Sequence, residues 1–245
     1  MNNGLSVIDL SKHFHRLRAL DRVDMQLGVG EIMGLIGPNG SGKTTFINTV
    51  TGVLTATAGK VMVDGKSVTG LKQHQIARRG LARTFQHVRL FSSLSVLENL
   101  VVAGISAGIR RSAARREGLN LLKHFGLDSW AEYPSDTLPQ GHERMVEVAR
   151  GLATRPRFLF LDEPAAGLDE EESAELLDRL RTIPAERELG LLIVEHDMGL
   201  IMKLCDRIHV LNHGRTIAEG APSDVKANPE VIEAYLGSDM DNNDA

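Results

Sequence analysis

The sequence predicts an α/β protein with a mostly parallel central sheet, an N-terminal antiparallel β region and an inserted helical subdomain. Three observations indicate this fold. Short strand-like runs separated by tight turns fill the chain up to residue 65. Helical periodicity replaces them from about residue 71 to residue 154. Strand-like and helical segments then alternate, which is the pattern of strands laid side by side with helices on both faces.

The N-terminal strands are recognised by short apolar runs bounded by turn residues. LSVIDL (5–10) and VDMQL (23–27) are predicted to pair antiparallel, and GVGE (28–31) forms a turn. The next strands are IMGLIG (32–37) and KVMVDG (60–65).

The helical block is marked by a capping-box spacing, Ser95 to Glu98, and by a one-sided apolar pattern after Gly141. The residues predicted to share that buried face are Met145, Val148, Ala149 and Leu152. After this block we expect strands at 157–161, 191–194, 207–211 and 215–220, and helices at 170–182, 197–204 and near the C-terminus.

These patterns predict a single domain over residues 1–245. Its core comprises residues 1–86 and 155–237, the helical subdomain comprises 87–154, and the acidic residues 238–245 form a disordered tail.

Composition restricts the class of protein and of partner. The net charge of −4 gives no general polyanion-binding signature, which argues against nucleic acid. The single cysteine, Cys205, excludes an intrachain disulfide. We find no signal peptide and no run of about 18 apolar residues. We therefore expect a protein that is soluble when isolated and cytosolic, and that reaches a membrane only through partners.

GPNGSGKT (37–44) has the G-x-x-x-x-G-K-[ST] spacing of a phosphate-binding loop, between a predicted strand and a predicted helix. Glycines let the backbone wrap a phosphate, and N–H groups converge on it at a helix N-terminus. Lys43 would reach the β- and γ-phosphates of ATP, and the Thr44 hydroxyl would ligate Mg²⁺. A glycine-rich turn that matches by accident is the alternative, which the flanking elements disfavour. The predicted nucleotide-binding residues are Gly37, Pro38, Asn39, Gly40, Ser41, Gly42, Lys43, Thr44 and Thr45.

FLFLDEP (158–164) is a buried-strand run that ends in two acids. At the carboxyl edge of a parallel sheet, Asp162 would position Mg²⁺ and Glu163 would accept a proton from the attacking water. The alternative, favoured for an isolated pair, is that both acids cap the next helix. His196 follows another apolar strand, and a contact to the γ-phosphate competes there with a purely structural role.

The ordered set GPNGSGKT, ARTFQH, an L-x-x-G segment, FLFLDEP, AAGLD and EHD resembles the ATP-binding-cassette (ABC) ATPases. Within that family, ARTFQHVRLF, DEPAAGLD and NPEVIEAYLG resemble the ATPase subunits of branched-chain amino acid importers. The resemblance implies a head-to-tail dimer that sandwiches two ATP molecules. It also implies transmembrane permease subunits, an indirectly acting solute-binding protein outside the cell, and a position at the cytoplasmic face of the membrane.

Carried over by position, the resemblance assigns roles to five residues, of which Glu163 and His196 receive the roles already inferred. Phe14 would stack on adenine, and Gln86 would sense the γ-phosphate or Mg²⁺. Glu163 would be the catalytic base, His196 the γ-phosphate contact, and Asp169 a residue that communicates across the dimer.

The signature segment, usually LSGGQ in this family, is LPQGH at residues 138–142. Pro139 offers neither the hydroxyl nor the N–H of the usual serine, so one hydrogen bond to the partner's γ-phosphate is lost. Gln140, Gly141 and His142 would still present N–H groups to an anion at a helix N-terminus. The segment is thus either a weakened anion clamp or harmless drift. A weakened clamp favours a heterodimer with one strong and one weaker site.

Three functions remain open: an ATPase that powers an importer, a low-activity regulatory ABC subunit, and a soluble ABC ATPase outside transport. Four arginines in GIRRSAARRE (108–117) indicate a solvated helix face or, alternatively, contact with anionic lipid or a membrane subunit. The resemblance places the permease's coupling helix beside Gln86, with apolar contacts that could equally be core residues: Leu90, Phe91 and Leu94.

Overall fold

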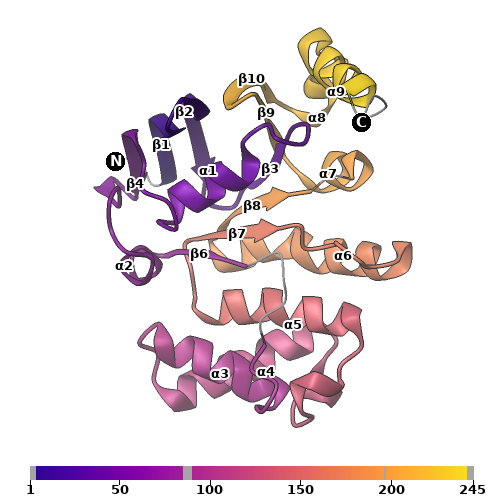
Figure 1. The fold of residues 1–245 in the computed structure, drawn as a ribbon. Coiled ribbons are helices and arrows are strands. Elements are labelled where there is room, and N and C mark those ends of the chain that lie inside the picture. Colours follow the sequence, from indigo (N-terminus) through magenta and orange to yellow (C-terminus); the bar gives the residue numbers. More distant parts are fainter. Residues whose placement is uncertain (1–3, 85–89, 196, 242–245) are drawn as a thin grey trace.

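The computed structural model describes residues 4–84, 90–195 and 197–241 (Figure 1). A four-stranded antiparallel sheet, in the order β2-β1-β4-β5, contains the N-terminal strands. Its members are β1 (Gly4–Phe14), β2 (Leu17–Gly28), β4 (Ala58–Val63) and β5 (Lys66–Ser67). The predicted antiparallel region is confirmed.

The second sheet has six strands in the order β10-β9-β3-β8-β7-β6. All neighbouring pairs are parallel except β10 with β9. Its members are β3 (Ile32–Ile36), β6 (Leu81–Arg83), β7 (Phe158–Asp162), β8 (Gly190–Val194), β9 (Arg207–Asn212) and β10 (Arg215–Gly220). The mostly parallel sheet is therefore confirmed, but β6 corrects our prediction of continuous helical structure from residue 71.

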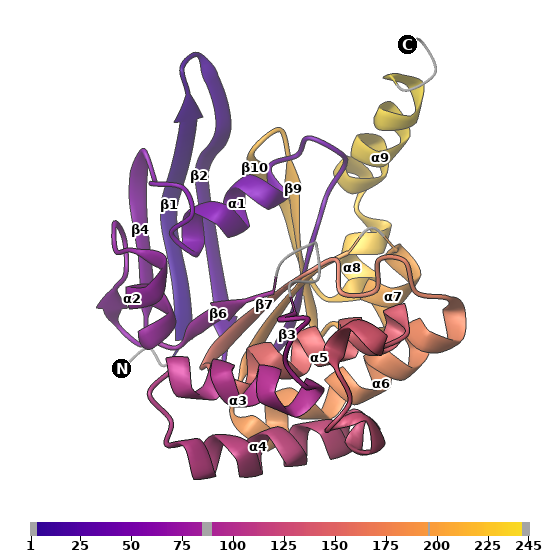
Figure 2. The same ribbon diagram turned by 60° about the horizontal axis from the view of Figure 1, so that its bottom comes forward.

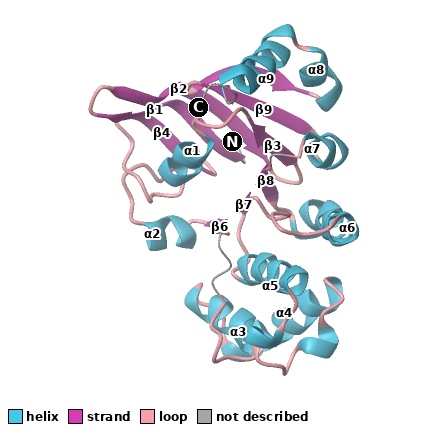
Figure 3. Cartoon of the chain, turned by 45° about the vertical axis from the view of Figure 1, so that its right-hand side comes forward, coloured by secondary structure: helices cyan, strands magenta, loops and turns pink. Residues whose placement is uncertain are grey.

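Alternate residues of the central strands enter two separate cores. On β7, Leu159 and Leu161 belong to the core that the sheet shares with the helical subdomain. Phe158 and Phe160 face the core around α1 (Lys43–Val50) on the other side. All four side chains are fully buried. A strand covered on both faces needs apolar residues at every position, which accounts for the unbroken FLFL run. Figure 3 shows the helices arranged on the two sides of this sheet.

The described part of the helical subdomain contains three α-helices that pack together below the sheet as drawn in Figure 1, and two short 3-10 helices, Asp128–Trp130 and Ser135–Thr137 (Figures 1 and 2). The α-helices are α3 (Val96–Ser106), α4 (Arg111–His124) and α5 (Gln140–Ala153). The Ser95–Glu98 capping box begins α3, with the Glu98 N–H donating to Ser95 Oγ at 3.1 Å. Gly104 and Gly118 permit close helix packing, because a Cβ at either would lie under 3.0 Å from Ala114 or Leu97. The four residues predicted for the buried face of α5 are all buried.

Glu117 on α4 connects the helical subdomain to the rest of the molecule. Its two carboxylate oxygens accept hydrogen bonds from Arg155 at 2.7 Å and from Arg187 at 2.5 Å. Burial alone would raise the pKa of Glu117, but the two arginines outweigh it and the pKa is lowered. The carboxylate therefore stays ionised and ties α4 to both guanidinium groups.

The remaining helices flank the sheet: α2 (Gln73–Arg78), α6 (Glu170–Arg187), α7 (Met198–Leu204), α8 (Pro222–Ala227) and α9 (Pro229–Asp241). Helix α9 continues to Asp241, and residues 242–245 lie outside the described part. The disordered tail over residues 238–245 stays a prediction. Within the described ranges no helix combines the length and apolar character needed to cross a bilayer.

Candidate functional site

A pocket of about 570 Å³ opens beside the loop that joins β3 to α1. The loop and the first turn of α1 form one wall, the end of β1 forms another, and Glu163 lies at the end of β7. The lining residues are Phe14, Leu17, Arg18, Ala19, Asn39, Gly40, Ser41, Gly42, Lys43, Thr44, Thr45, Glu163, Val194, His213 and Gly214. Most of the predicted phosphate-binding residues thus share one cavity with the predicted base.

The glycines at both ends of this loop are required by close backbone packing. Gly37 has a φ of 150°, and a Cβ there would lie 2.0 Å from the Leu211 carbonyl oxygen. Gly42 has a φ of 109°, and its Cβ would lie 2.8 Å from the Ala19 carbonyl oxygen. Any other residue at these positions would push the loop off its supports, so the spacing of the motif is a steric requirement of this fold.

Lys43 lies inside the loop, with its side chain nearly fully buried. Its Nζ donates to the carbonyl oxygens of Gly37 at 2.7 Å and Pro38 at 3.1 Å. Burial lowers the pKa of Lys43, while the charges of Glu163 and Asp162 oppose that shift. Among the described residues, the ammonium's hydrogen bonds go to these two carbonyl oxygens, and phosphate oxygens could replace them.

Ser41 provides an independent indication of a ligand. The residue is 2% exposed, and its Oγ has no hydrogen-bond partner within the described part of the chain. A buried hydroxyl without a partner costs roughly 1–3 kcal/mol. Because Ser41 also lines the pocket, a bound ligand's oxygen or a water molecule could satisfy it.

Asp162 ends β7 and is 6% exposed. Arg83 Nη2 lies 3.3 Å from Asp162 Oδ2, and Arg83 Nη1 donates to Asn48 Oδ1 at 2.6 Å. Arg83 therefore links the predicted magnesium acid to the helix that follows the phosphate loop. Our sequence reasoning missed Arg83 and Asn48, because the short strand β6 carries no detectable period. The signal that could have found Arg83 is its position three residues before Gln86 in ARTFQH.

Glu163 adopts a left-handed backbone with a φ of 51°. For a residue with a Cβ this conformation costs roughly 1–2 kcal/mol. The Glu163 N–H donates to the Val194 carbonyl at 2.9 Å, and the side chain lines the pocket. The turn thus directs the carboxylate toward the phosphate loop, and such strain is a recurrent feature of functional sites.

Phe14 lies at the end of β1 and is 39% exposed. Its ring lines the same pocket, and Lys12 Nζ is 4.9 Å from the ring centroid. The neighbouring His15 is exposed and does not line the pocket. Phe14 therefore has the exposed aromatic face that stacking on a base requires, and its role with adenine stays a prediction.

The signature segment lies away from this pocket. Gln140, Gly141 and His142 are the first residues of α5, after Pro139 at its N-cap, and none of them is among the described residues that line the pocket. A Cβ on Gly141 would lie 2.3 Å from Glu172 Oε1, so α5 begins against α6. The His142 ring contacts Trp130, with centroids 5.3 Å apart.

Asp169 has a local function in the chain. It is the N-cap of α6, where its Oδ1 accepts the Glu172 N–H at 2.8 Å and Glu172 completes a capping box. The predicted communication across a dimer is a separate role and stays a prediction. Gln86 and His196, two further predicted site residues, lie outside the described residues.

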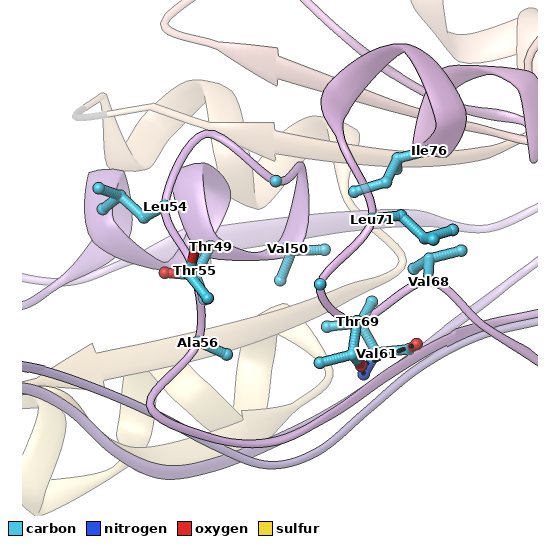
Figure 4. Close-up of a pocket in the computed structure, with 12 residues that line it drawn as sticks. Thr49, Val50, Leu54, Thr55, Ala56, Val61, Val68, Thr69, Leu71 and Ile76 are labelled. Atoms are coloured by element: carbon cyan, nitrogen blue, oxygen red, sulfur yellow. Dashed lines mark hydrogen bonds between the residues drawn. The ribbon is translucent and has the colours of Figure 1, made fainter.

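A second, smaller cavity lies beside α1 and is lined by residues within the range 49–76 (Figure 4). Its volume is about 30 Å³, and none of the described residues that line it is charged. This cavity is too small for a nucleotide, so the site is the pocket beside Lys43.

Two family models and several known proteins match this chain. A family model described as "ABC transporter" matches residues 20–166, and one described as "branched-chain amino acid ATP-binding cassette transporter" matches residues 215–241. The chain is 39% identical to the high-affinity branched-chain amino acid transport ATP-binding protein BraF of Pseudomonas aeruginosa, and the match covers 95% of this chain and 97% of BraF. It is 41% identical, with the same coverage, to LivG of Escherichia coli K12, which carries the same description.

A solved structure shares the fold over nearly the whole chain. It is the ADP conformation of an ATP-binding cassette of an ABC transporter, with a TM-score of 0.87 and 28% sequence identity. The match covers 97% of this chain and 100% of that one.

Replacing Arg83 with Met should lower the free energy of unfolding by about 3 kcal/mol, because it removes the guanidinium that pairs with the buried Asp162 carboxylate. Urea unfolding measures this. The matched control is Arg115→Met, since Arg115 is paired with Glu132 on the surface and should contribute at most about 1 kcal/mol. Equal losses in the two variants would contradict the role given to Arg83.

Proposed function

Since the chain belongs to the ABC transporter family, whose ATP-binding domains hydrolyse ATP, we propose that it powers a membrane importer for branched-chain or other hydrophobic amino acids. The observation that carries the proposal is the joint pocket of Lys43, Thr44 and Glu163 in a chain so similar to BraF and LivG. The identity of the transported amino acid rests on those relatives alone.

The chain's own residues divide the work of hydrolysis. Backbone N–H groups of residues 40–45 and the Lys43 ammonium bind the phosphates and stabilise charge that develops on them. Glu163 faces the same pocket and accepts the proton of the attacking water. His196 would contact the γ-phosphate, and Phe14 would hold the adenine.

Magnesium fits the oxygen atoms at this site. The Thr44 hydroxyl and the Asp162 carboxylate are hard oxygen ligands of the kind Mg²⁺ prefers, and the substrate's phosphates complete such sites. Gln86 is the third candidate ligand. Mg²⁺ would neutralise negative charge on the phosphates, and Arg83 would hold Asp162 in position for it.

A complete site requires a second ABC subunit. The signature segment begins α5, outside the pocket that holds the phosphate loop, and a head-to-tail dimer would bring one chain's segment to the other chain's phosphates. In this arrangement Asp169, at the start of α6, would lie near the partner and communicate across the interface.

Pro139 would weaken both sites of a homodimer, but only one site of a heterodimer with an ordinary partner. Proline has no N–H, and a lost hydrogen bond to a charged phosphate costs about 1.5–3 kcal/mol. The N–H groups of Gln140, Gly141 and His142 remain for the partner's phosphate. We therefore propose a heterodimer, in which an ordinary partner supplies a full-strength signature to this chain's ATP.

Association with the membrane would occur through permease subunits, at the cytoplasmic face. Phe91 is 52% exposed, and Arg150 lies 6.0 Å from its ring, while Leu90 and Leu94 are partly buried. Phe91 is thus the apolar side chain most available to a coupling helix. A solute-binding protein would act through the permease, without touching this chain.

A second candidate is a regulatory subunit that binds nucleotide and hydrolyses it poorly, which Pro139 in the signature favours. ATPase activity of the assembled complex separates the two. A soluble ABC ATPase outside transport is the third candidate, and co-purification with membrane proteins separates it from the first.

Replacing Lys43 with Ala should weaken MgATP binding by about ten- to a hundred-fold, because one charge-assisted contact to the phosphates is lost. Replacing Glu163 with Gln should leave binding intact and reduce kcat by about a hundred-fold or more. Calorimetry and phosphate release measure these effects, with the exposed residues Lys66→Ala and Glu170→Gln as controls. Parent-like binding by the Lys43 variant would refute the proposed site.

In a complex with its partner subunit, Glu163→Gln should reduce turnover more than replacement of the partner's equivalent glutamate. The reason is that Glu163 belongs to the composite site that contains the partner's ordinary signature. Steady-state ATPase of the two single variants measures the difference. Equal losses would count against unequal sites.

A further inference from the structure

Glu195 is a buried acid that the mechanism above does not use. It follows the last residue of β8 and is 7% exposed, among strand residues that are all apolar or glycine. Burying a carboxylate is costly, and an apolar side chain would fill the same space without that penalty. An acid at this position therefore calls for a specific partner.

One partner in the described part of the chain is the loop that carries Glu163. Glu195 Oε1 accepts the backbone N–H of Ala165 at 2.7 Å, and both residues are buried. Pro164, between Glu163 and Ala165, has no N–H to donate. The Ala165 N–H is thus the first main-chain donor after Glu163, and the Glu195 carboxylate holds it.

A main-chain hydrogen bond alongside makes this a two-point attachment. The Glu163 N–H donates to the Val194 carbonyl at 2.9 Å, one residue before Glu195. Residues 163 and 165 are therefore both fixed to the end of β8. Glu163 has the left-handed φ of 51°, and a strained conformation persists only where its surroundings enforce it.

The far side of the same loop reaches the signature segment. Two backbone hydrogen bonds close turns in this loop. The Ala166 N–H donates to the Glu163 carbonyl oxygen at 3.2 Å, and the Leu168 N–H donates to the Ala165 carbonyl oxygen at 3.1 Å. At Gly167, φ is 80° and a Cβ would lie 2.5 Å from Gln140 Nε2. A loop held by Glu195 on one side thus contacts α5 on the other.

We propose that Glu195 is a positioning residue for hydrolysis, which fixes the loop that aims Glu163 into the pocket. This inference rests on the proposed function. Glu195 touches no substrate in this role, so it should affect kcat and leave nucleotide affinity, which depends on the phosphate loop, unchanged.

The test compares Glu195→Asp with Glu195→Gln in the full-length chain. If a partner subunit co-purifies with the chain, the complex is used. Asp keeps the charge, but its side chain is one methylene shorter and cannot accept the Ala165 N–H in the same geometry. Gln has the same length as Glu and keeps an oxygen that can accept this hydrogen bond. We expect Asp to reduce kcat about tenfold and Gln to stay within about threefold of the parent, with the Kd for MgATP unchanged in both. Glu186→Asp, at an exposed position of α6, is the matched control.

Amide hydrogen exchange supplies a readout that does not depend on activity. In Glu195→Asp, exchange at Ala165 should accelerate about tenfold relative to the parent, and in Glu195→Gln it should not. Parent-like kcat and exchange in the Asp variant, or an equal loss of kcat in both variants, would overturn the proposal. A different result would overturn the proposed function, and the positioning role with it: the parent protein hydrolyses no ATP, or its hydrolysis persists in the Lys43→Ala variant.

Discussion

Val194 pairs with Leu35 of β3 on one side and with Asp162 of β7 on the other, both in parallel. Three strands therefore end at one level of the sheet. The next residues along each strand lead into the phosphate loop, to Glu163 and to Glu195, which must lie close together at this edge. The placement of Glu163 and Glu195 depends on that register, because a shift of one residue would turn the side chains at the ends of these strands to the opposite face.

The site contains several arrangements that oppose stability. Lys43 and Asp162 are buried ionisable groups, Ser41 Oγ lacks a partner in the described part of the chain, and Glu163 is left-handed. Two well-packed cores on either side of the sheet offset these terms. Arg83 and Glu195 are alike in one respect, since each forms a hydrogen bond with a buried polar group close to Glu163, the proposed base. The local penalties are consistent with a site built to bind an anion.

The sequence predicted those features that have a local signature. Glycine spacing identified the phosphate loop because only glycine fits at Gly37 and Gly42, and unbroken apolar runs identified strands that are buried on both faces. Contacts between distant segments were not predictable. Arg83 belongs to a strand of three residues, and the partner of Glu195 is thirty positions away in the chain.

The most direct test of the account is amide hydrogen exchange of the parent protein with and without MgATP. The account predicts that protection on adding nucleotide is concentrated in two segments, residues 37–45 and 162–168, which meet at the pocket. Protection that leaves both segments unchanged, or that appears only elsewhere in the chain, would contradict it.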